Sequence, residues 1–199
     1  MLIILSTIAI ILSSSVIAAL FTAITNFQIK SKEIYVQIKL EEQNKWITNL
    51  NDAQRNYVDA ITAYNMDLMR YSVNEIKTFD ISKKLIETNK AHNNLIFYIY
   101  QSEFSTSLIK DIEKITNEIT DTINNQRKAT LEYRVNKIEK AELKEIASEC
   151  EENIGSKNYE LSEKLGVLIR TEKKELTNKT KNQITKWIKE KFKRTTNGQ

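Results

Sequence analysis

The side chains that could carry acid–base or nucleophilic chemistry in this sequence are one histidine, His92, one cysteine, Cys150, and many glutamates. A catalytic histidine needs a nucleophile and an orienting acid close to it. The nearest candidates along the chain are Ser102, Ser105 and Glu103, and neither a nucleophile elbow nor a glycine-rich loop surrounds them. We therefore interpret His92 as a partly buried structural residue.

Cys150 lies among glutamates, in the sequence ASECEEN. Negative neighbours raise the pKa of a thiol, whereas a reactive thiolate needs a lowered pKa, so we interpret Cys150 as a structural or surface thiol. A carboxylate-bridged metal pair in a helical bundle needs Glu-x-x-His motifs, but Asn89 stands three residues before the single histidine. Gly155 and Gly166 are isolated and form no phosphate-binding loop. The sequence predicts no enzyme, metal site, cofactor or small-molecule substrate.

The composition points to helices. The 199 residues include no proline and three glycines, whereas sandwiches and barrels need turn residues every 8–12 positions. A single cysteine also excludes an intramolecular disulfide framework. We expect an all-α chain.

The N-terminal segment is strongly apolar. No charged side chain occurs from Leu2 to Thr25, and the first is Lys30. As a helix these 24 residues would extend roughly 36 Å, enough to cross the hydrocarbon core of a bilayer. We predict a transmembrane signal-anchor helix over residues 1–28. A cleaved signal peptide is the alternative, but it would need a basic segment before the apolar run, and none is present.

The orientation of this span follows from the basic residues around it. Lys30, Lys32, Lys39 and Lys45 follow the apolar run, and no lysine or arginine precedes it. Because basic residues favour the cytoplasmic side, we expect the N-terminus outside and the remainder of the chain in the cytoplasm of a bacterium. A lone Cys150 agrees with a reducing compartment.

A seam of apolar and aromatic residues at alternating spacings of three and four begins after the predicted span. Such spacing is typical of a helix that packs in a bundle or coiled coil. The seam is made by Trp46, Leu50, Tyr57, Ile61, Tyr64, Leu68 and Tyr71, with Ile34 and Ile38 as its expected extension toward the membrane. We predict a helix over residues 29–77, whose seam either closes an intramolecular bundle or drives oligomerisation.

The rest of the chain is also expected to be helical. The predicted helices cover 81–100, 102–153 and 157–193, with residues 195–199 as a frayed tail. Asp80 or Ser82 is the expected N-cap of the first of these helices. The second has either a turn near residue 125 or a stutter, and Gly155 is read as its C-terminal signal. The apolar run at 95–100, at the end of the helix predicted over 81–100, is expected to be the most buried turn of the bundle. Residues 29–194 would thus form an elongated antiparallel helical bundle or coiled-coil domain.

Charge is distributed unevenly near the C-terminus. Residues 139–163 carry eight glutamates and three lysines, a net charge of −5, while residues 170–194 carry ten basic residues and three glutamates, a net charge of +7. The two segments could pair. The candidate contact residues of the basic helix are Lys181, Lys186, Trp187, Lys189, Phe192, Lys193 and Arg194. Its apolar side could pack on the bundle, and the helix could instead lie on an anionic membrane surface or bind nucleic acid.

Three groups of residues resemble a family of uncharacterised bacterial and phage proteins with an N-terminal membrane helix and a small helical domain. They are Lys45–Ile47 with Leu50; Asn89–Ala91 leading to Leu95–Ile99, then Glu103 and Leu108–Ile109; and Leu168–Glu172. The chain departs from the pattern at Asn51, where a basic residue is expected, and at Lys173, where tryptophan is expected. The resemblance implies a membrane-anchored helical protein with no known activity, often associated with mobile elements or phage defence.

The function that these observations favour is that of a single-pass membrane protein, bound to the lipid bilayer. It would act by contact with a protein partner or by homo-oligomerisation at the inner face of a bacterial membrane. One alternative is a membrane-tethered nucleic-acid-binding protein that uses the basic C-terminal helix. The other is a membrane-perturbing phage or phage-defence effector.

Overall fold

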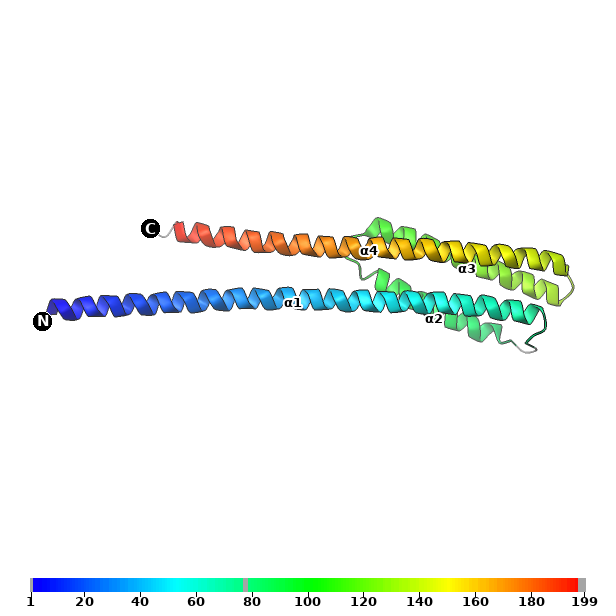
Figure 1. The fold of residues 1–199 in the computed structure, drawn as a ribbon, viewed down its shortest axis with the longest axis horizontal. Coiled ribbons are helices and arrows are strands. Elements are labelled where there is room, and N and C mark those ends of the chain that lie inside the picture. The colour runs from blue at the N-terminus through cyan, green and yellow to red at the C-terminus, as the bar shows by residue number, and fades with distance from the viewer. Residues whose placement is uncertain (1, 77–78, 197–199) are drawn as a thin grey trace. The chain divides into compact units, whose positions relative to one another are not determined.

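All regular secondary structure in the described residues is helical, which confirms the all-α prediction (Figure 1). The computed structural model describes residues 2–76 and 79–196, with the side chains of all of these except residues 2–17, 21, 184 and 187–196. The helices are α1 (Leu2–Ser72), α2 (Ile81–Ile99), α3 (Thr106–Arg134) and α4 (Lys140–Thr196).

The chain divides into two compact units, residues 1–45 and residues 46–199. The first unit is the N-terminal part of α1, and none of its described side chains is buried. The second unit contains the remainder of α1 together with α2, α3 and α4. This second unit is a helical bundle with its own core.

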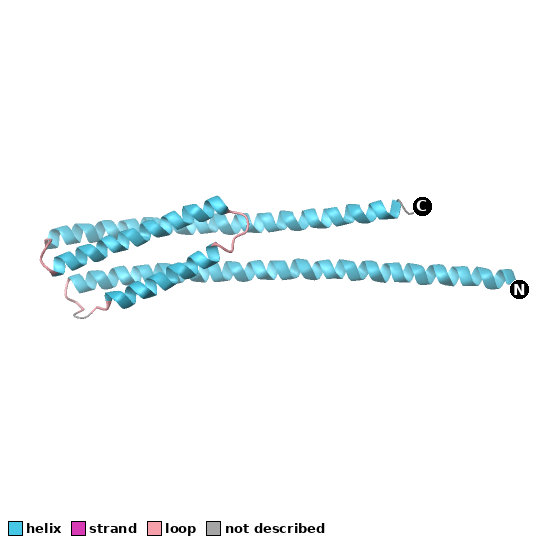
Figure 2. Cartoon of the chain, turned by 180° about the vertical axis from the view of Figure 1, so that it is seen from behind, coloured by secondary structure: helices cyan, strands magenta, loops and turns pink. Residues whose placement is uncertain are grey.

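Consecutive helices of the bundle run antiparallel, and α2 and α3 lie on one side of the pair formed by α1 and α4 (Figure 2). Ion pairs join the neighbours. The Lys84 ammonium lies 3.2 Å from the Asp67 carboxylate, between α2 and α1. The Lys164 ammonium lies 3.1 Å from the Asp111 carboxylate, between α4 and α3. The bundle prediction is therefore confirmed at the level of helical architecture.

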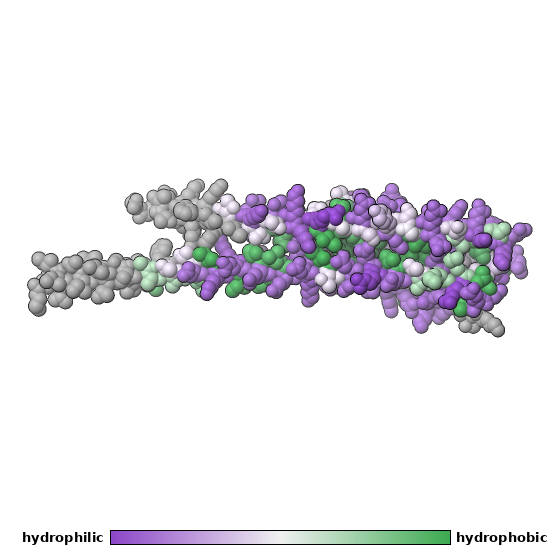
Figure 3. Space-filling view, in the orientation of Figure 1, coloured by the Kyte–Doolittle hydropathy of each residue, from purple (hydrophilic) through white to green (hydrophobic). Residues whose placement is uncertain are grey.

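The core is built from leucine, isoleucine and tyrosine at helical spacing. Its most deeply buried large side chains are Leu50, Tyr57, Ile61, Tyr64, Leu68, Leu95, Ile99, Ile112, Ile119, Leu161, Leu165 and Leu168. Each such side chain contributes about 1.5–3 kcal/mol by leaving water. Figure 3 shows polar residues over most of the visible outer surface of the bundle, with hydrophobic residues gathered along the line between α1 and α4.

The helix ends follow local capping chemistry. Asp80 is the N-cap of α2, as the sequence predicts, and its side chain accepts a hydrogen bond of 2.9 Å from the N–H of Lys83. Asn74 and Asn136 follow the ends of α1 and α3 with φ of 63° and 57°. Asparagine tolerates this left-handed conformation better than most residues and closes a helix where glycine is absent.

The predicted turn near residue 125 is wrong. Helix α3 continues through that position to Arg134, and the chain turns between residues 135 and 139. The buried stripe explains this, because Ile119, Ile123 and Gln126 keep one spacing on both sides of residue 125. The helix predicted over 102–153 is therefore two helices, α3 and the start of α4. The buried stripe ends together with α3, and Val135, just after the helix, is 61% exposed.

The predicted helix end at Gly155 is also wrong, because α4 runs without a break from Lys140 to Thr196. Glycine inside a helix costs about 1 kcal/mol relative to alanine. Buried Ile154 and Leu161 flank the position and offset that cost by packing on the bundle. The acidic and basic segments consequently lie in succession along one helix and do not fold against each other. The helix predicted over 157–193 is the C-terminal part of α4.

Three further features differ from the prediction: the end of α1, the extent of its seam and the C-terminal tail. Helix α1 ends at Ser72 rather than at residue 77, where Asn74 turns the chain. Ile34 and Ile38 do not extend a buried seam, since they are 55% and 47% exposed. The expected frayed tail begins inside α4, whose last residue is Thr196, and residues 197–199 lie outside the described part of the chain.

Among the residues whose side chains are described, no helix has a stretch long and apolar enough to cross a membrane. The predicted span over residues 1–28 falls largely outside these residues, since the side chains of residues 1–17 and 21 are not among them. The transmembrane helix therefore stays a prediction from the sequence.

Candidate functional site

The basic C-terminal part of α4 begins where the helix leaves the core. Glu172 is its last buried residue among the described side chains. Residues 173–186 carry five lysines and one glutamate, a net charge of +4. All five lysines are exposed: Lys173, Lys174, Lys179, Lys181 and Lys186. This segment is the basic end of α4, and it offers a cationic surface on a rigid helix.

Two of the predicted contact residues, Lys181 and Lys186, therefore lie exposed on the basic end of α4. The other predicted contacts are in α4 as well, but their side chains lie outside the described residues. They are Trp187, Lys189, Phe192, Lys193 and Arg194. Which side of α4 their apolar members occupy follows only from the helical spacing of the sequence.

Glu172 fastens the start of the basic end to the loop between α2 and α3. The residue is 7% exposed. It accepts a hydrogen bond of 3.0 Å from the N–H of Phe104 and a second from the hydroxyl of Ser102. Hydrogen bonds to a charged, buried acceptor are stronger than neutral ones. The loop and α4 thus hold each other in place at this end of the bundle.

Lys179 adds a second, weaker attachment two turns farther along α4. Its ammonium lies 3.5 Å from the Glu103 carboxylate and 5.5 Å from the centroid of the Phe104 ring. Exposed ion pairs contribute about 0–1 kcal/mol to stability. The contact of Lys179 therefore helps to orient α4 against the loop but adds little to the stability of the bundle. In the described residues no acidic group lies within ion-pair distance of Lys173, Lys174, Lys181 or Lys186.

The bundle end that holds this loop is also the end where α1 enters the second unit. The indole N–H of Trp46 donates a hydrogen bond of 2.8 Å to the carbonyl oxygen of Tyr98, at the end of α2. Tyr98 precedes the same loop that Glu172 caps. The basic end of α4 therefore leaves the bundle at the same end as Trp46, the first residue of the second unit.

The predicted seam of α1 lies inside the bundle. Leu50, Tyr57, Ile61, Tyr64 and Leu68 are at most 1% exposed, while Trp46 and Tyr71 are partly buried. The Tyr57 hydroxyl lies 3.3 Å from the Thr116 carbonyl oxygen, to which it donates. Burial raises the pKa of Tyr57 to about 12, against the opposing effect of a hydrogen bond with Thr120. These side chains pack against other helices of the same chain.

The aromatic run at 95–100 is not buried all round, contrary to expectation. Leu95 and Ile99 are fully buried, but Phe97 and Tyr100 are 59% and 57% exposed. Positions four apart on a helix share a face, whereas Phe97, midway between Leu95 and Ile99, points away from them. The Tyr100 hydroxyl instead donates to the carboxylate of Glu113 on α3.

Polar side chains inside the core were missed by sequence reasoning. Asn65, Thr116, Gln126 and Thr130 are all buried. The Thr130 hydroxyl and the Gln126 carbonyl oxygen have no hydrogen-bond partner among the described residues. The signal was present in the spacing, because Thr116, Gln126 and Thr130 continue the three-and-four pattern of the α3 isoleucines. Apolar residues alone therefore underestimate the length of this buried stripe.

His92 packs on the seam, as a partly buried residue. Its ring centroid lies 5.7 Å from that of Tyr57. Its Nε2 atom is buried and has no partner in the described part of the chain. Burial lowers the pKa of His92 below its ordinary 6.5, although Asn93 and Glu113 oppose this shift. The neutral imidazole is the form that the fold favours.

We expect the bundle to lose stability on acidification through His92. Its pKa is lower in the folded than in the unfolded chain, so the unfolded chain binds more protons below about pH 6.5. The free energy of unfolding should be at its full value above the unfolded pKa. It should fall as the pH drops through that pKa toward the folded one. Chemical denaturation at pH 7 and at about pH 5 measures the difference, and His92→Gln should flatten it. If His92→Gln loses as much free energy of unfolding between pH 7 and pH 5 as the parent chain, groups other than His92 cause the loss.

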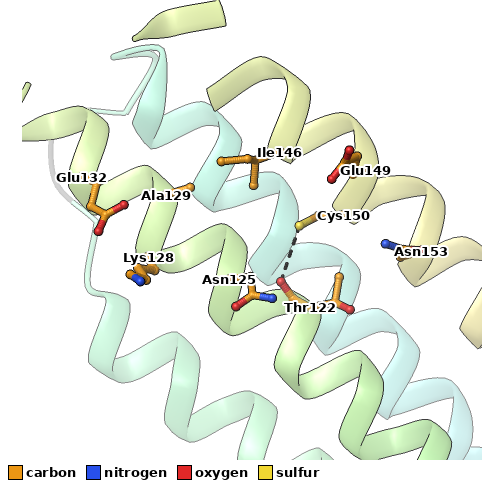
Figure 4. A pocket seen from close by; sticks show the side chains of 9 residues that line it. All are labelled: Thr122, Asn125, Lys128, Ala129, Glu132, Ile146, Glu149, Cys150 and Asn153. Atoms are coloured by element: carbon orange, nitrogen blue, oxygen red, sulfur yellow. Dashed lines mark hydrogen bonds between the residues drawn. The ribbon is translucent and has the colours of Figure 1, made fainter. Parts of the chain in front are cut away.

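Cys150 is buried and lines a pocket of about 330 Å³ between α3 and α4 (Figure 4). Its thiol lies 3.5 Å from the carbonyl oxygen of Thr122. Burial raises the pKa of the Cys150 thiol, and the charge of Glu149 raises it further. A protonated, hydrogen-bonded thiol is a poor nucleophile. The pocket is otherwise lined by Asn125, Lys128, Ala129, Glu132, Ile146 and Asn153.

Within the described residues, no group of three or more histidine, cysteine, aspartate or glutamate side chains could hold a metal ion. Comparison of the chain with protein-family models, with curated proteins and with solved structures gives no match. The resemblance drawn from the sequence motifs therefore stays an expectation.

Proposed function

We propose that the chain is a single-pass protein of a bacterial membrane, with its N-terminus outside and its helical bundle in the cytoplasm. The bundle acts by contact with other macromolecules at the inner face of the membrane. In this proposal the basic end of α4 lies on the anionic inner leaflet and orients the bundle for contact with a protein partner or another copy.

The observation that carries the proposal is the exposed charge on the basic end of α4, net +4 over residues 173–186 with no described side chain buried. Each basic residue close to an anionic leaflet contributes about 1 kcal/mol of attraction. Trp46, the first residue of the second unit, lies at the end of the bundle from which this segment leaves. Glu172 and Lys179 hold the segment to the same loop.

The test uses the two tryptophans of the chain as reporters. Trp46→Phe in the full-length protein leaves Trp187, which belongs to the basic helix, as the only tryptophan. The protein is reconstituted into vesicles of phosphatidylcholine alone or with phosphatidylglycerol. We expect the emission of Trp187 to shift to the blue, and brominated lipid to quench it, only in the anionic vesicles. High salt should reverse both effects by screening the charges.

A charge-matched pair of variants makes the test specific. Replacing Lys173, Lys174, Lys181 and Lys186 by glutamine should abolish the lipid-dependent shift. The same replacement at four exposed lysines elsewhere, Lys83, Lys90, Lys110 and Lys137, should leave it intact. Equal Trp187 emission in neutral and anionic vesicles would overturn the lipid contact. A shift produced by duplex DNA but not by anionic lipid would assign the same lysines to nucleic acid.

A further inference from the structure

The first unit carries an apolar stripe that nothing in the described residues covers. It consists of Leu20, Ile24, Phe27, Ile34 and Ile38, which are 58%, 56%, 75%, 55% and 47% exposed. We call these five residues the stalk stripe. Lipid would cover Leu20, Ile24 and Phe27 within the predicted span, but Ile34 and Ile38 follow it. Apolar side chains exposed to water on one face of a helix are unusual unless a partner covers them.

The stalk stripe has the spacing of a coiled-coil seam. Its members are separated by four, three, seven and four residues, with Ser31 at the intervening position. In heptad notation Leu20, Phe27 and Ile34 occupy d positions, while Ile24 and Ile38 occupy a positions. Isoleucine at a with leucine at d, as at Ile24 and Leu20, is typical of two-stranded parallel coiled coils, and one polar residue at a specifies register. Ile34 at d with Ile38 at a also occurs in assemblies of three or four strands. The stripe is therefore complementary to an identical copy of itself.

The stalk stripe is not an extension of the bundle seam. Continuing the seam of α1 backward from Trp46 in heptad steps reaches residues 43, 39, 36 and 32. Ile34 lies two residues from positions 32 and 36, which is about 200° around a helix, and Ile38 lies two residues from position 36 and one from position 39, about 200° and 100°. The seam is filled by the core of the second unit. In the described part of the chain the stalk stripe, unlike the seam, is therefore free of contacts with the core of the second unit.

We propose that the stalk stripe pairs with the stalk stripe of a second copy of this chain, as a parallel two-stranded coiled coil. The inference rests on the proposed membrane anchor, which would hold two copies parallel and in the same register. Anchoring also raises their effective concentration, so that a short seam suffices. Ile34 and Ile38 follow the predicted span and pair by leaving water. Residues 20–27 fall inside the predicted span and contribute by packing.

The residues that flank the stripe permit this pairing. In a parallel pair each g position meets the following e position of the partner helix. These pairs are Lys30 with Tyr35 and Gln37 with Glu42, so no like charges face each other. Glu42 also forms an ion pair of 2.7 Å with Lys39 of its own chain.

Cysteine cross-linking in membranes of expressing cells tests the pairing. In a Cys150→Ala background, Ile34→Cys and Ile38→Cys are each exposed positions that alter no buried contact. We expect mild oxidation to convert most of either variant to a covalent dimer of twice the chain mass. Glu33→Cys, exposed and about 100° around the helix from Ile34, is the matched control and should stay mainly monomeric.

Equal cross-linking at residues 33, 34 and 38, or none at 34 and 38, would overturn the inference. A cross-linked species of another mass would assign the stripe to a different protein. Carbonate extraction of the same samples separates this result from the proposed function. If the protein stays in the membrane but does not cross-link, the coiled coil is wrong and the membrane anchor is supported. If the cross-linked protein is found in the soluble fraction, the membrane anchor is wrong and the pairing of the two copies is supported.

Discussion

Replacing Glu172 by alanine is expected to lower the free energy of unfolding by about 2–4 kcal/mol. The carboxylate is buried and accepts hydrogen bonds from the N–H of Phe104 and the hydroxyl of Ser102. Removing it leaves two donors in a partly buried site, and each buried donor left unpaired costs about 1–3 kcal/mol. Urea denaturation of the full-length protein, followed by circular dichroism, measures the loss.

Two companion variants of this site separate charge from hydrogen bonding. Glu172→Gln keeps an acceptor oxygen but no charge, so about half of the loss should remain. Ser102→Ala removes one donor and should cost about 1 kcal/mol. Hydrogen exchange at the Phe104 amide should accelerate in Glu172→Ala, because the loop opens locally more often. Glu172→Ala with the stability of the parent chain would show that the loop does not depend on this carboxylate.

Replacing Ile61 by alanine is expected to lower the free energy of unfolding by about 2–5 kcal/mol. Ile61 is 0% exposed and lies midway along the seam of α1. Truncation removes buried methyl groups and leaves a cavity that the close-packed bundle fills only in part. The same truncation at Ile34, which is 55% exposed and lies outside the bundle core, should change the free energy of unfolding of the bundle by no more than about 0.5 kcal/mol. Paired denaturation curves measure both.

The Ile61 variant also distinguishes an internal seam from an oligomeric one. Because the seam packs against helices of its own chain, the loss should be the same at every protein concentration. A loss that shrinks as concentration rises would place Ile61 at a contact between copies. A large loss at Ile34 would mean that the stalk stripe, rather than the bundle core, dominates stability.

The local sequence was sufficient for the helical character of the chain and for the members of the α1 seam. Both depend on short-range regularities, namely the absence of proline and a spacing of three and four. Capping was predictable for the same reason, since Asp80 acts on Lys83, three residues away. These features involve contacts within one or two turns of a helix.

The missed helix boundaries have a common cause. Gly155 and the asparagines near residue 125 are weak local signals, worth about 1 kcal/mol or less each. Burial of Ile123, Ile154 and their neighbours against other helices exceeds that cost. The true turn after α3 has a stronger local device, because Asn136 adopts a left-handed conformation with φ of 57°.

The basic end of α4 likewise combines features that the sequence predicts with features that depend on packing. The sequence alone determined that the C-terminal helix is basic and that the N-terminal run is apolar, because charge and hydropathy are properties of single residues. Only the tertiary structure decided where α4 leaves the core, through a buried Glu172 that reaches a loop some 70 residues earlier in the chain. Contacts between distant segments depend on how several helices pack at once, and no spacing within one helix encodes them.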